Sequence, residues 1–270
     1  MPELPEVETT VRGLAHVLQG QRLTRVAAHR ADLRRPFPPD LVQALTGAHV
    51  SSLGRRAKYG LIHIDRGQTL VFHLGMSGRW RIDPARPDKH DHFVLETESG
   101  HVLALNDPRR FGSLDLVPTD SLAQWPQFAA MGPEPLGEDL TARHLKAAFA
   151  GRRQAIKLLL LDQRIVAGLG NIYVCEALFR AGISPERAGG SVSLPALGRL
   201  VPAIRQVLEE SIADGGSTLR DFARPDGELG YFATRFHVYG REGEPCRCGG
   251  TVRRIVQGGR STWYCPRCQK

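Results

Sequence analysis

Four of the chain's five cysteines follow residue 245, and this cluster most constrains how the C-terminal end can fold. Cys246 and Cys248 form a first pair, and Cys265 and Cys268 form a second pair beyond a glycine-containing turn. Two close pairs of thiolates across a hairpin-like segment are typical of a structural zinc ribbon. The second pair has the usual two-residue spacer, whereas the first has a single residue between its cysteines. We therefore expect one structural Zn²⁺ rather than free cysteines, and the geometry of the first pair stays open.

The balance of charges indicates an anionic partner. The 270 residues carry a formal net charge of +8, and the sequence pI is about 9.6. Such a charge favours nucleic acid first and an acidic membrane second. The N-terminus is acidic and lacks the apolar stretch of a secretory signal, and no apolar run approaches the ~20 residues of a membrane-spanning helix. We therefore expect neither a secretory signal nor a membrane partner.

The chain begins MPELPEVE, which places a proline and a glutamate beside the terminus. Removal of the initiator methionine leaves the secondary amine of Pro2, and an α-amino group titrates near ~8. Such an amine attacks an aldehyde to form a cationic iminium, and Glu3 stands beside it as a proton carrier. The alternative is structural, because prolines also suit the first turn of a helix. Apolar residues at helical spacing from Val7 to Leu18, ended by Gly20, predict that helix in either case.

Residues 21–117 read as short strands separated by turns. Partly alternating apolar residues predict strands at 21–29, 58–65, 69–74, 92–96, 101–106 and 113–117. Arg66-Gly67 and Ser99-Gly100 have the composition of hairpin turns. Together these strands predict an antiparallel β-sandwich or barrel.

Three stretches in this region are unusual for a scaffold, namely 53–59 (LGRRAKY), 73–78 (HLGMSG) and 107–112 (DPRRFG). For each one alone, a solvated basic turn is the simpler interpretation. Met76 and Phe111, however, stand at glycine-flanked turns, where a core side chain is not expected. Apolar side chains beside arginines are what some proteins insert into a stack of bases. The three stretches together therefore favour contact with DNA.

Residues 118–140 are rich in proline, glycine and acidic residues and read as a domain linker. Helical periodicity then predicts helices at 141–149, 153–162, 171–182 and about 195–215. The turn GLGN, between the second and third of these, presents backbone amides and a helix N-terminus to a phosphate. Residues 217–231 lack periodicity, and a loop of this length is usually functional or disordered.

The motifs PELPEVE, RRAKY, HLGMSG, KHDHF, DPRRFG, GLGNIY, VYGREGEPC and GGRSTWYCPRCQ follow one another along the chain. This series resembles that of the bacterial formamidopyrimidine-DNA glycosylases, and the similarity covers essentially the whole chain. It implies an α+β multidomain fold that starts with an N-terminal helix and an antiparallel β-sandwich (1–133). It also implies a helix–two-turn–helix domain (134–239), which includes a lesion-covering loop at about 217–231, and a C-terminal zinc finger (240–270).

The resemblance implies excision of oxidised purines, such as 8-oxoguanine and formamidopyrimidines, from damaged double-stranded DNA. The terminal proline attacks C1′ of the damaged nucleoside, and the Schiff base then permits β- and δ-elimination, which is an AP lyase activity. The implied cofactor is one structural Zn²⁺, with no small-molecule cofactor, and the implied state is a monomer. The implied location is the bacterial cytoplasm, with the nucleoid.

The resemblance also implies roles for individual residues. The implied catalytic residues are Pro2 as nucleophile, Glu3 as proton donor to the sugar, Lys58 in β-elimination and Arg260 in δ-elimination. A guanidinium is a poor acid, so clamping a phosphate is an equal expectation for Arg260. The implied DNA-binding residues are His73, His92, Arg110, Arg153, Lys157 and Asn171.

Two further groups of residues complete the implied site. Met76, Arg109 and Phe111 fill the space that a flipped base leaves in the duplex, which offsets the cost of flipping. Ser217, Thr218 and Tyr239 belong to the region that covers the lesion.

Two other functions remain as alternatives. An endonuclease VIII-like enzyme for oxidised pyrimidines belongs to the same superfamily, but the PELPE start, the DPRRFG turn and the long loop favour the purine enzyme. A non-catalytic DNA-binding zinc-ribbon protein explains the charge, the helical pair and the ribbon. It does not explain a terminal amine beside Glu3, nor Lys58.

Overall fold

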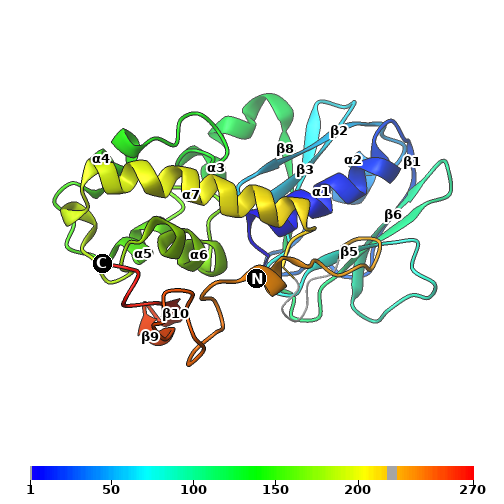
Figure 1. Ribbon diagram of the computed structural model, residues 1–270. Helices are drawn as coiled ribbons and strands as arrows, with labels where there is room; N and C mark the ends of the chain where they lie inside the picture. Colours follow the sequence, from blue (N-terminus) through cyan, green and yellow to red (C-terminus); the bar gives the residue numbers. More distant parts are fainter. Residues whose placement is uncertain (1, 218–223) are drawn as a thin grey trace. The chain divides into compact units, whose positions relative to one another are not determined.

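The computed structural model describes residues 2–217 and 224–270 (Figure 1). Backbone contacts divide the chain into two compact units, and each is described by itself. Unit 1 comprises Met1–Ala129 and Asp214–Tyr231, and unit 2 comprises Ala130–Ala213 and Phe232–Lys270. A membrane-crossing helix, which needs a long and strongly apolar segment, is absent from the described parts of both units.

Helix α1 (Leu4–Leu18) opens unit 1 and confirms the helix predicted there. A capping box between Glu3 and Glu6 closes its first turn, and Pro5 suits that turn because its fixed φ is helical. The residues at helical spacing, Val7, Val11, Leu14 and Leu18, are buried in the core of the unit.

Unit 1 contains two antiparallel four-stranded sheets. The first has the order β1 (Leu23–Ala28), β6 (Asp91–Thr97), β7 (Val102–Asn106) and β5 (Arg79–Ile82). The second has the order β2 (Val50–Arg56), β3 (Tyr59–Ile64), β4 (Gln68–His73) and β8 (Ser113–Pro118). Each predicted strand is present, with small shifts at its ends.

The sequence does not predict strands β2 and β5, nor the short helix α2 (Leu41–Leu45). Both strands lie at the edges of their sheets. Edge strands commonly carry charged and polar residues, which discourage pairing with another chain. The residues SSLGRR of β2 and RWRI of β5 therefore lack the alternation of apolar and polar side chains on which the strand prediction depends.

The core of the sandwich lies between the inner faces of the two sheets. Trp80, Leu95 and Leu103 from the first sheet share one buried cluster with Ile62 and Phe72 from the second. The apolar face of α1 joins the same cluster. Alternate side chains along each strand point to the two outer faces, as the strand geometry requires. The predicted β-sandwich is confirmed.

Unit 2 contains the helices α4 (Ala142–Phe149), α5 (Ile156–Leu160), α6 (Asn171–Ala181) and α7 (Leu194–Ala213), with the short 3₁₀ turns η2 (Gly189–Ser191) and η3 (Phe232–Arg235). The Thr141 hydroxyl caps α4 by accepting the His144 N–H at 3.1 Å, as predicted. Gly182 ends α6 in the left-handed conformation with a φ of 68°, also as predicted. Helix α5 is shorter than predicted, because Ala155 has a non-helical ψ of 136° and forms a bridge with Ala188.

The ribbon at the C-terminus is a hairpin of β9 (Arg253–Gln257) and β10 (Arg260–Tyr264). It lies between the two cysteine pairs, as predicted.

The linker prediction for residues 118–140 is wrong for the first half of that segment. This half forms the 3₁₀ helix η1 (Thr119–Gln124) and the short helix α3 (Pro126–Ala129) within unit 1. The rings of Trp125 and Phe128 pack edge-on against Tyr59, with centroids 5.8 and 5.4 Å away. Tertiary packing of these two aromatic rings therefore overrides the local proline and glycine signals.

Candidate active site and nucleic-acid interface

Pro2 and Glu3 lie buried at the start of α1. The Glu3 N–H donates to Oε2 of Glu6 at 2.9 Å, which fixes the path of the terminus. Glu6 is itself only 2% exposed, and its Oε1 accepts the backbone N–H of Ser217 at 2.9 Å. One buried carboxylate therefore joins the terminus to the predicted lesion loop. The sequence analysis missed Glu6, although a glutamate three residues after Glu3 has the capping-box spacing.

The loop predicted at 217–231 is described at its two ends. A Cβ on Gly230 would lie 2.3 Å from the carbonyl oxygen of Gly216, so these two backbones are in direct contact. Ser217 and Tyr231 form an isolated antiparallel bridge beside them. The two ends of the loop therefore lie together on unit 1. Thr218 lies outside the described residues.

Lys58 lies in the tight turn between β2 and β3, where Arg56 pairs with Tyr59. Ala57 adopts a left-handed conformation in this turn, with a φ of 52°, and Lys58 is 7% exposed. Burial, together with the charge of Lys58, lowers the pKa of the neighbouring His73 to about 4. The His73 ring is therefore neutral at physiological pH.

Met76 and Phe111 lie on two turns that touch each other. Their side chains are 39% and 43% exposed, so neither serves as a core residue. A Cβ on Gly75 would lie 2.3 Å from the carbonyl carbon of Phe111, which shows that the two turns meet backbone to backbone. The guanidinium carbon of Arg109 lies 4.9 Å from the centroid of the Phe111 ring. The structure thus brings together the three residues predicted to enter the base stack.

A buried carboxylate braces these two turns. Asp107 is fully buried, and it accepts the Ser77 hydroxyl at 2.6 Å and the Gly112 N–H at 2.8 Å. The Ser77 oxygen in turn accepts the Arg109 N–H at 3.1 Å. The predicted DNA-binding His92 is 5% exposed, and its Nε2 faces the Asp107 carbonyl at 3.0 Å. Arg110, on the same turn as Asp107, is exposed.

Replacing Gly75 with alanine tests the contact between the two turns. The added Cβ meets the Phe111 backbone, which cannot yield as a flexible side chain does. We expect Gly75→Ala to lower the thermal midpoint and to slow the base excision that the sequence resemblance implies by at least about tenfold, because the turns are pushed apart. Gly67→Ala is the matched control, since Gly67 also has a positive φ (71°) but has no neighbour within 4 Å of the added atom. The control loses about 1–2 kcal/mol of backbone energy and keeps its activity. Equal effects of the two substitutions would contradict this account.

Three predicted DNA-binding residues of unit 2 occupy different environments. Lys157 is fully buried, and its Nζ donates to the Thr262 hydroxyl at 2.7 Å and to the Ser261 carbonyl at 3.3 Å. Asn171, at the start of α6, donates its amide to the same Ser261 carbonyl at 2.9 Å. Arg153, by contrast, is exposed. The burial of Lys157 favours a supporting role, in which Lys157 and Asn171 hold the ribbon strand that begins at the exposed Arg260.

Glu176 is a second functional candidate that the sequence analysis missed. It is fully buried within α6, and its carboxylate accepts the backbone N–H groups of His237, Val238 and Tyr239 at 2.9–3.1 Å. Burial alone raises the pKa of Glu176, but these hydrogen bonds and the His237 side chain lower it below its usual range. The carboxylate therefore fixes the segment that carries the predicted Tyr239. An acidic residue inside the apolar sequence IYVCEALF is the signal that marks it.

The four cysteines of the ribbon form one compact cluster, with all Sγ atoms within 4.8 Å of one another. The Sγ atoms of Cys246 and Cys268 are 3.7 Å apart, and those of Cys248 and Cys265 are 3.6 Å apart. A tetrahedral zinc site with Zn–S bonds of about 2.3 Å has sulfur–sulfur edges of about 3.8 Å, so the cluster fits this ion. The single-residue spacer of the first pair does not prevent the fit.

The turn after Cys248 accounts for that short spacer. Gly249 has a φ of 77°, and a Cβ on Gly250 would lie within 3.2–3.3 Å of two of the cysteine sulfurs. The Gly250 N–H also donates to the Cys248 sulfur at 3.4 Å. The two glycines therefore let the chain close tightly around the four thiolates, and the protein holds one structural Zn²⁺ there.

Removing this zinc is expected to weaken the DNA binding that the sequence predicts, because a ribbon of this size folds only on its metal. The measurement is the affinity for a lesion-containing duplex before and after treatment with a chelator, with the metal content determined in parallel. Addition of Zn²⁺ to the stripped protein is the control, and it restores the affinity. Unchanged binding after demonstrated loss of the metal would contradict the expectation.

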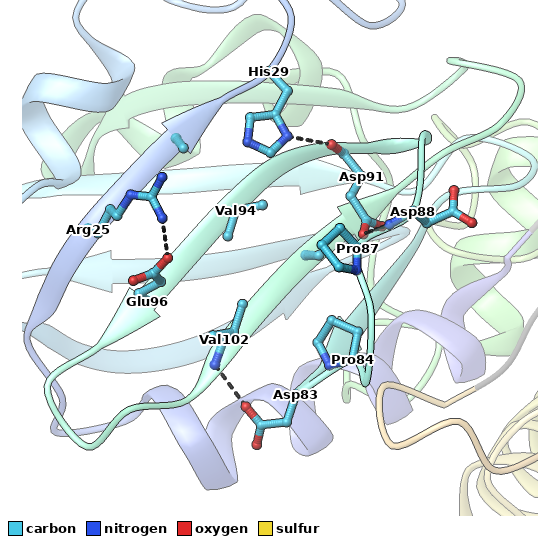
Figure 2. A pocket seen from close by; sticks show the side chains of 12 residues that line it. Arg25, His29, Asp83, Pro84, Pro87, Asp88, Asp91, Val94, Glu96 and Val102 are labelled. Carbon is cyan, nitrogen blue, oxygen red and sulfur yellow. Dashed lines mark hydrogen bonds and ion pairs between the residues drawn. The ribbon is translucent and has the colours of Figure 1, made fainter.

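A hollow of about 530 Å³ on the outer face of the first sheet is unsuited to DNA (Figure 2). Carboxylates of Asp83, Asp88, Asp91 and Glu96 line it. The arginine in its lining, Arg25, is paired with Glu96 at 2.6 Å. Carboxylates outnumber the arginines around this hollow, even with Arg81 paired to Asp91, and this disfavours a polyanion there.

The fold and the site define a multidomain zinc-finger protein whose capped N-terminus lies on a β-sandwich. Three family descriptions match the chain: "Formamidopyrimidine-DNA glycosylase N-terminal domain" at residues 1–114, "Formamidopyrimidine-DNA glycosylase H2TH domain" at 131–223, and "Zinc finger found in FPG and IleRS" at 243–270. The chain belongs to the formamidopyrimidine-DNA glycosylase family.

Individual relatives agree with this assignment. The formamidopyrimidine-DNA glycosylase of Novosphingobium aromaticivorans is 76% identical over 270 residues, with both chains covered completely. The crystal structure of MutM (Fpg) from Thermus thermophilus is 42% identical with a TM-score of 0.89, and the match covers 99% of this chain and 98% of that one. A complex of Lactococcus lactis Fpg with DNA containing an abasic site is 34% identical, with a TM-score of 0.92 and complete coverage of both chains.

Proposed function

We propose that the protein is a base-excision repair enzyme that removes oxidised purines from double-stranded DNA and cleaves the strand by AP lyase chemistry. The observation that carries this proposal is the buried Pro2–Glu3 start of α1 on the same unit as the paired turns of Met76 and Phe111. A binding protein has no need of a terminal amine beside a glutamate that a capping box holds in place. Family membership makes 8-oxoguanine and formamidopyrimidines the expected bases.

The terminal amine supplies the nucleophile for this reaction. The Pro2 nitrogen lone pair forms a bond to C1′ while the bond from C1′ to the damaged base breaks, and the bonding electrons leave with the base, which takes up the proton that the Pro2 nitrogen loses. Glu3 donates a proton to the sugar, whose ring then opens. A secondary amine gives a cationic iminium, which accepts electrons from the adjacent carbon. The iminium therefore prepares the sugar for elimination.

Elimination cleaves the strand on both sides of the sugar. Loss of a C2′ proton breaks the bond from C3′ to oxygen, and we assign assistance in this step to Lys58. The second elimination breaks the bond from C5′ to oxygen, and we assign it to Arg260, whose guanidinium clamps the departing phosphate at least as readily as it transfers a proton. Each phosphate leaves as a stable anion.

The remaining residues bind and open the duplex in this proposal. His73, His92, Arg110 and Arg153 contact the DNA backbone, and Lys157 and Asn171 position the ribbon strand that carries Arg260. Met76, Arg109 and Phe111 fill the gap left by the flipped base. The loop beginning at Ser217, with Thr218 and the later Tyr239, covers the lesion.

The proposed functional divisions are 1–133, 134–239 and 240–270. We also propose that the enzyme acts as a monomer in the bacterial cytoplasm, where the nucleoid provides its substrate.

Borohydride trapping tests the function directly. A duplex with one 8-oxoguanine opposite cytosine is incubated with the protein and borohydride, and the adduct is mapped by peptide sequencing. An adduct on the peptide that begins at Pro2 establishes the chemistry, the lesion class and the nucleophile together. An adduct on Lys58 would support the lyase activity but identify Lys58, and not Pro2, as the nucleophile.

Absence of an adduct, with a confirmed free Pro2 terminus, would favour the two alternatives. A matched duplex carrying thymine glycol separates them. Trapping on that duplex alone indicates an enzyme for oxidised pyrimidines. Tight binding of both lesions without any strand cleavage indicates a non-catalytic DNA-binding protein.

A further inference from the structure

Arg55, in strand β2, joins helix α1 to the turn that carries Lys58. Its Nε donates to Oε2 of Glu8 at 2.9 Å, and its Nη1 donates to the Ala57 carbonyl at 3.0 Å. Glu8 lies in α1, the helix whose first turn begins beside Pro2, and Ala57 immediately precedes Lys58. One guanidinium therefore connects the helix that starts at the candidate nucleophile with the peptide unit before the candidate lysine. Neither Arg55 nor Glu8 has a role in the reaction described above.

The turn that Arg55 contacts has an unusual residue in its first position. Arg56 pairs with Tyr59, so Ala57 and Lys58 alone form the turn. Ala57 has a φ of 52°, and a two-residue hairpin turn usually places Gly, Asn or Asp at such a position. The Cβ of an alanine is strained there, and such a conformation persists only where the surrounding contacts hold it. The hydrogen bond from Arg55 to the Ala57 carbonyl is one of these contacts, and it acts on the peptide unit that leads to Lys58.

Glu8 anchors the Arg55 guanidinium on α1. The Arg55 side chain is only 10% exposed, and a guanidinium that is largely removed from water needs a counter-charge beside it. Burial alone raises the pKa of Glu8, but the hydrogen bonds from Arg55 and Arg12 lower it below its usual range. The carboxylate is therefore charged at neutral pH. With one side of its fork bound to Glu8, Arg55 holds the Ala57 carbonyl with the other.

Arg12 binds the same carboxylate in a different way. Its Nε donates to Oε1 of Glu8 at 2.8 Å, and its side chain is 63% exposed. In the part of the chain that the structure describes, the Arg12 guanidinium has no other partner. An exposed pair spaced four residues apart on one helix contributes little to stability. Arg12 thus shares Glu8 with Arg55 but does not connect α1 to another element, and this contrast provides a control.

We propose that Arg55 is a positioning residue for the first elimination, and that it acts by fixing the peptide unit between Ala57 and Lys58. This inference rests on the proposed function, because it takes β-elimination assisted by Lys58 as the step. Lys58 is only 7% exposed, so a displaced backbone carries its side chain to a different place among its neighbours. Misplacement of a reacting group by about 1 Å can slow a reaction by about 10²-fold. Arg55 itself touches no reacting atom in this account.

Separate measurement of two steps of the reaction tests this proposal. A duplex with a preformed aldehydic abasic site needs no base release, so borohydride trapping reports iminium formation and strand cleavage reports elimination. Both rates are measured in single turnover for the wild type, Arg55→Lys, Lys58→Ala and the double variant. Lysine keeps a cation for Glu8 but lacks the fork that reaches two acceptors. Glu8→Gln is a second variant with a weakened anchor, and Arg12→Ala is the matched control.

We expect Arg55→Lys to form the trapped iminium within about threefold of the wild-type rate, because the capping box that holds Glu3 does not involve Arg55. Its strand cleavage falls by about tenfold or more, since Lys58 is displaced. Lys58→Ala and the double variant cleave at the same rate, because two residues that act through one group are not additive. Glu8→Gln shows a smaller loss of cleavage with trapping retained. Arg12→Ala keeps both wild-type rates.

Three results would overturn the proposal. Arg55→Lys and Glu8→Gln could both cleave like the wild type. Either variant could lose trapping and cleavage by the same factor, together with its thermal midpoint, which would make the Glu8–Arg55 pair a general structural contact. The double variant could cleave more slowly than Lys58→Ala, which would show that Arg55 acts independently of Lys58. If the wild type traps normally, each of these results rejects the positioning role alone. A wild type that neither traps nor cleaves rejects the proposed function itself.

Discussion

A protein with one additional residue before Pro2 is expected to lose base release and borohydride trapping completely. The added residue converts the secondary amine into an amide, whose nitrogen lone pair is delocalised and no longer nucleophilic. Loss of a catalytic nucleophile typically slows an enzyme by about 10³-fold or more. Binding to a duplex with a tetrahydrofuran site is expected to change by less than about threefold. The measurements are single-turnover excision of 8-oxoguanine and the dissociation constant of the uncleavable duplex.

Pro2→Gly is the matched control for this experiment. After removal of the initiator methionine it keeps a terminal amine, but a primary one on a more flexible residue. We expect reduced but measurable trapping, because a primary amine still forms a Schiff base. The burial of Pro2 and Glu3 makes a packing defect a competing explanation, so thermal midpoints of both variants are compared. Normal excision by the extended protein would remove the terminal amine from the mechanism.

Local signals were sufficient to predict most elements of the fold. Thr141 and Gly182 are residue types that commonly cap helices. The start of α4 at Thr141 and the end of α6 at Gly182 were predicted on that ground, and both are confirmed. The edge strands β2 and β5 escape prediction because their polar residues hide the alternation. Trp125 and Phe128 pack against Tyr59 within the segment predicted as a linker. The prediction failed there because Tyr59 is remote from them in the sequence.

The contacts that assemble the candidate site could not be predicted for the same reason. Glu6 meets Ser217 across 211 positions, and Ser77 meets Asp107 across 30. Each partner is unremarkable in its own stretch of sequence, and only the folded chain brings the pair together. Lys157 shows the converse case. The motif around it resembles a phosphate ligand, but the tertiary structure buries its ammonium group against Thr262, 105 positions away.

Glu176→Gln is expected to destabilise unit 2 by roughly 3 kcal/mol, because it removes a buried charge that several donors share. The carboxylate accepts three backbone N–H groups, and its Oε2 also lies 3.3 Å from Nδ1 of His237. Glutamine keeps one acceptor, but its NH₂ group faces the N–H donors of His237. The segment that carries Tyr239 then loses its anchor. We expect a lower midpoint in denaturant and weaker binding of lesion-containing DNA.

Glu210→Gln is the matched control, because Glu210 accepts two hydrogen bonds from Arg180 but its side chain is 32% exposed. Water compensates for much of the loss there, so the expected cost is below about 1 kcal/mol. The two variants make the same chemical change in the same unit and differ mainly in burial and in the kind of donor. An equal loss of unfolding free energy in the two variants would show that the burial of Glu176 does not add to its contribution. A large effect confined to Glu176→Gln identifies its carboxylate as the group that positions residues 237–239.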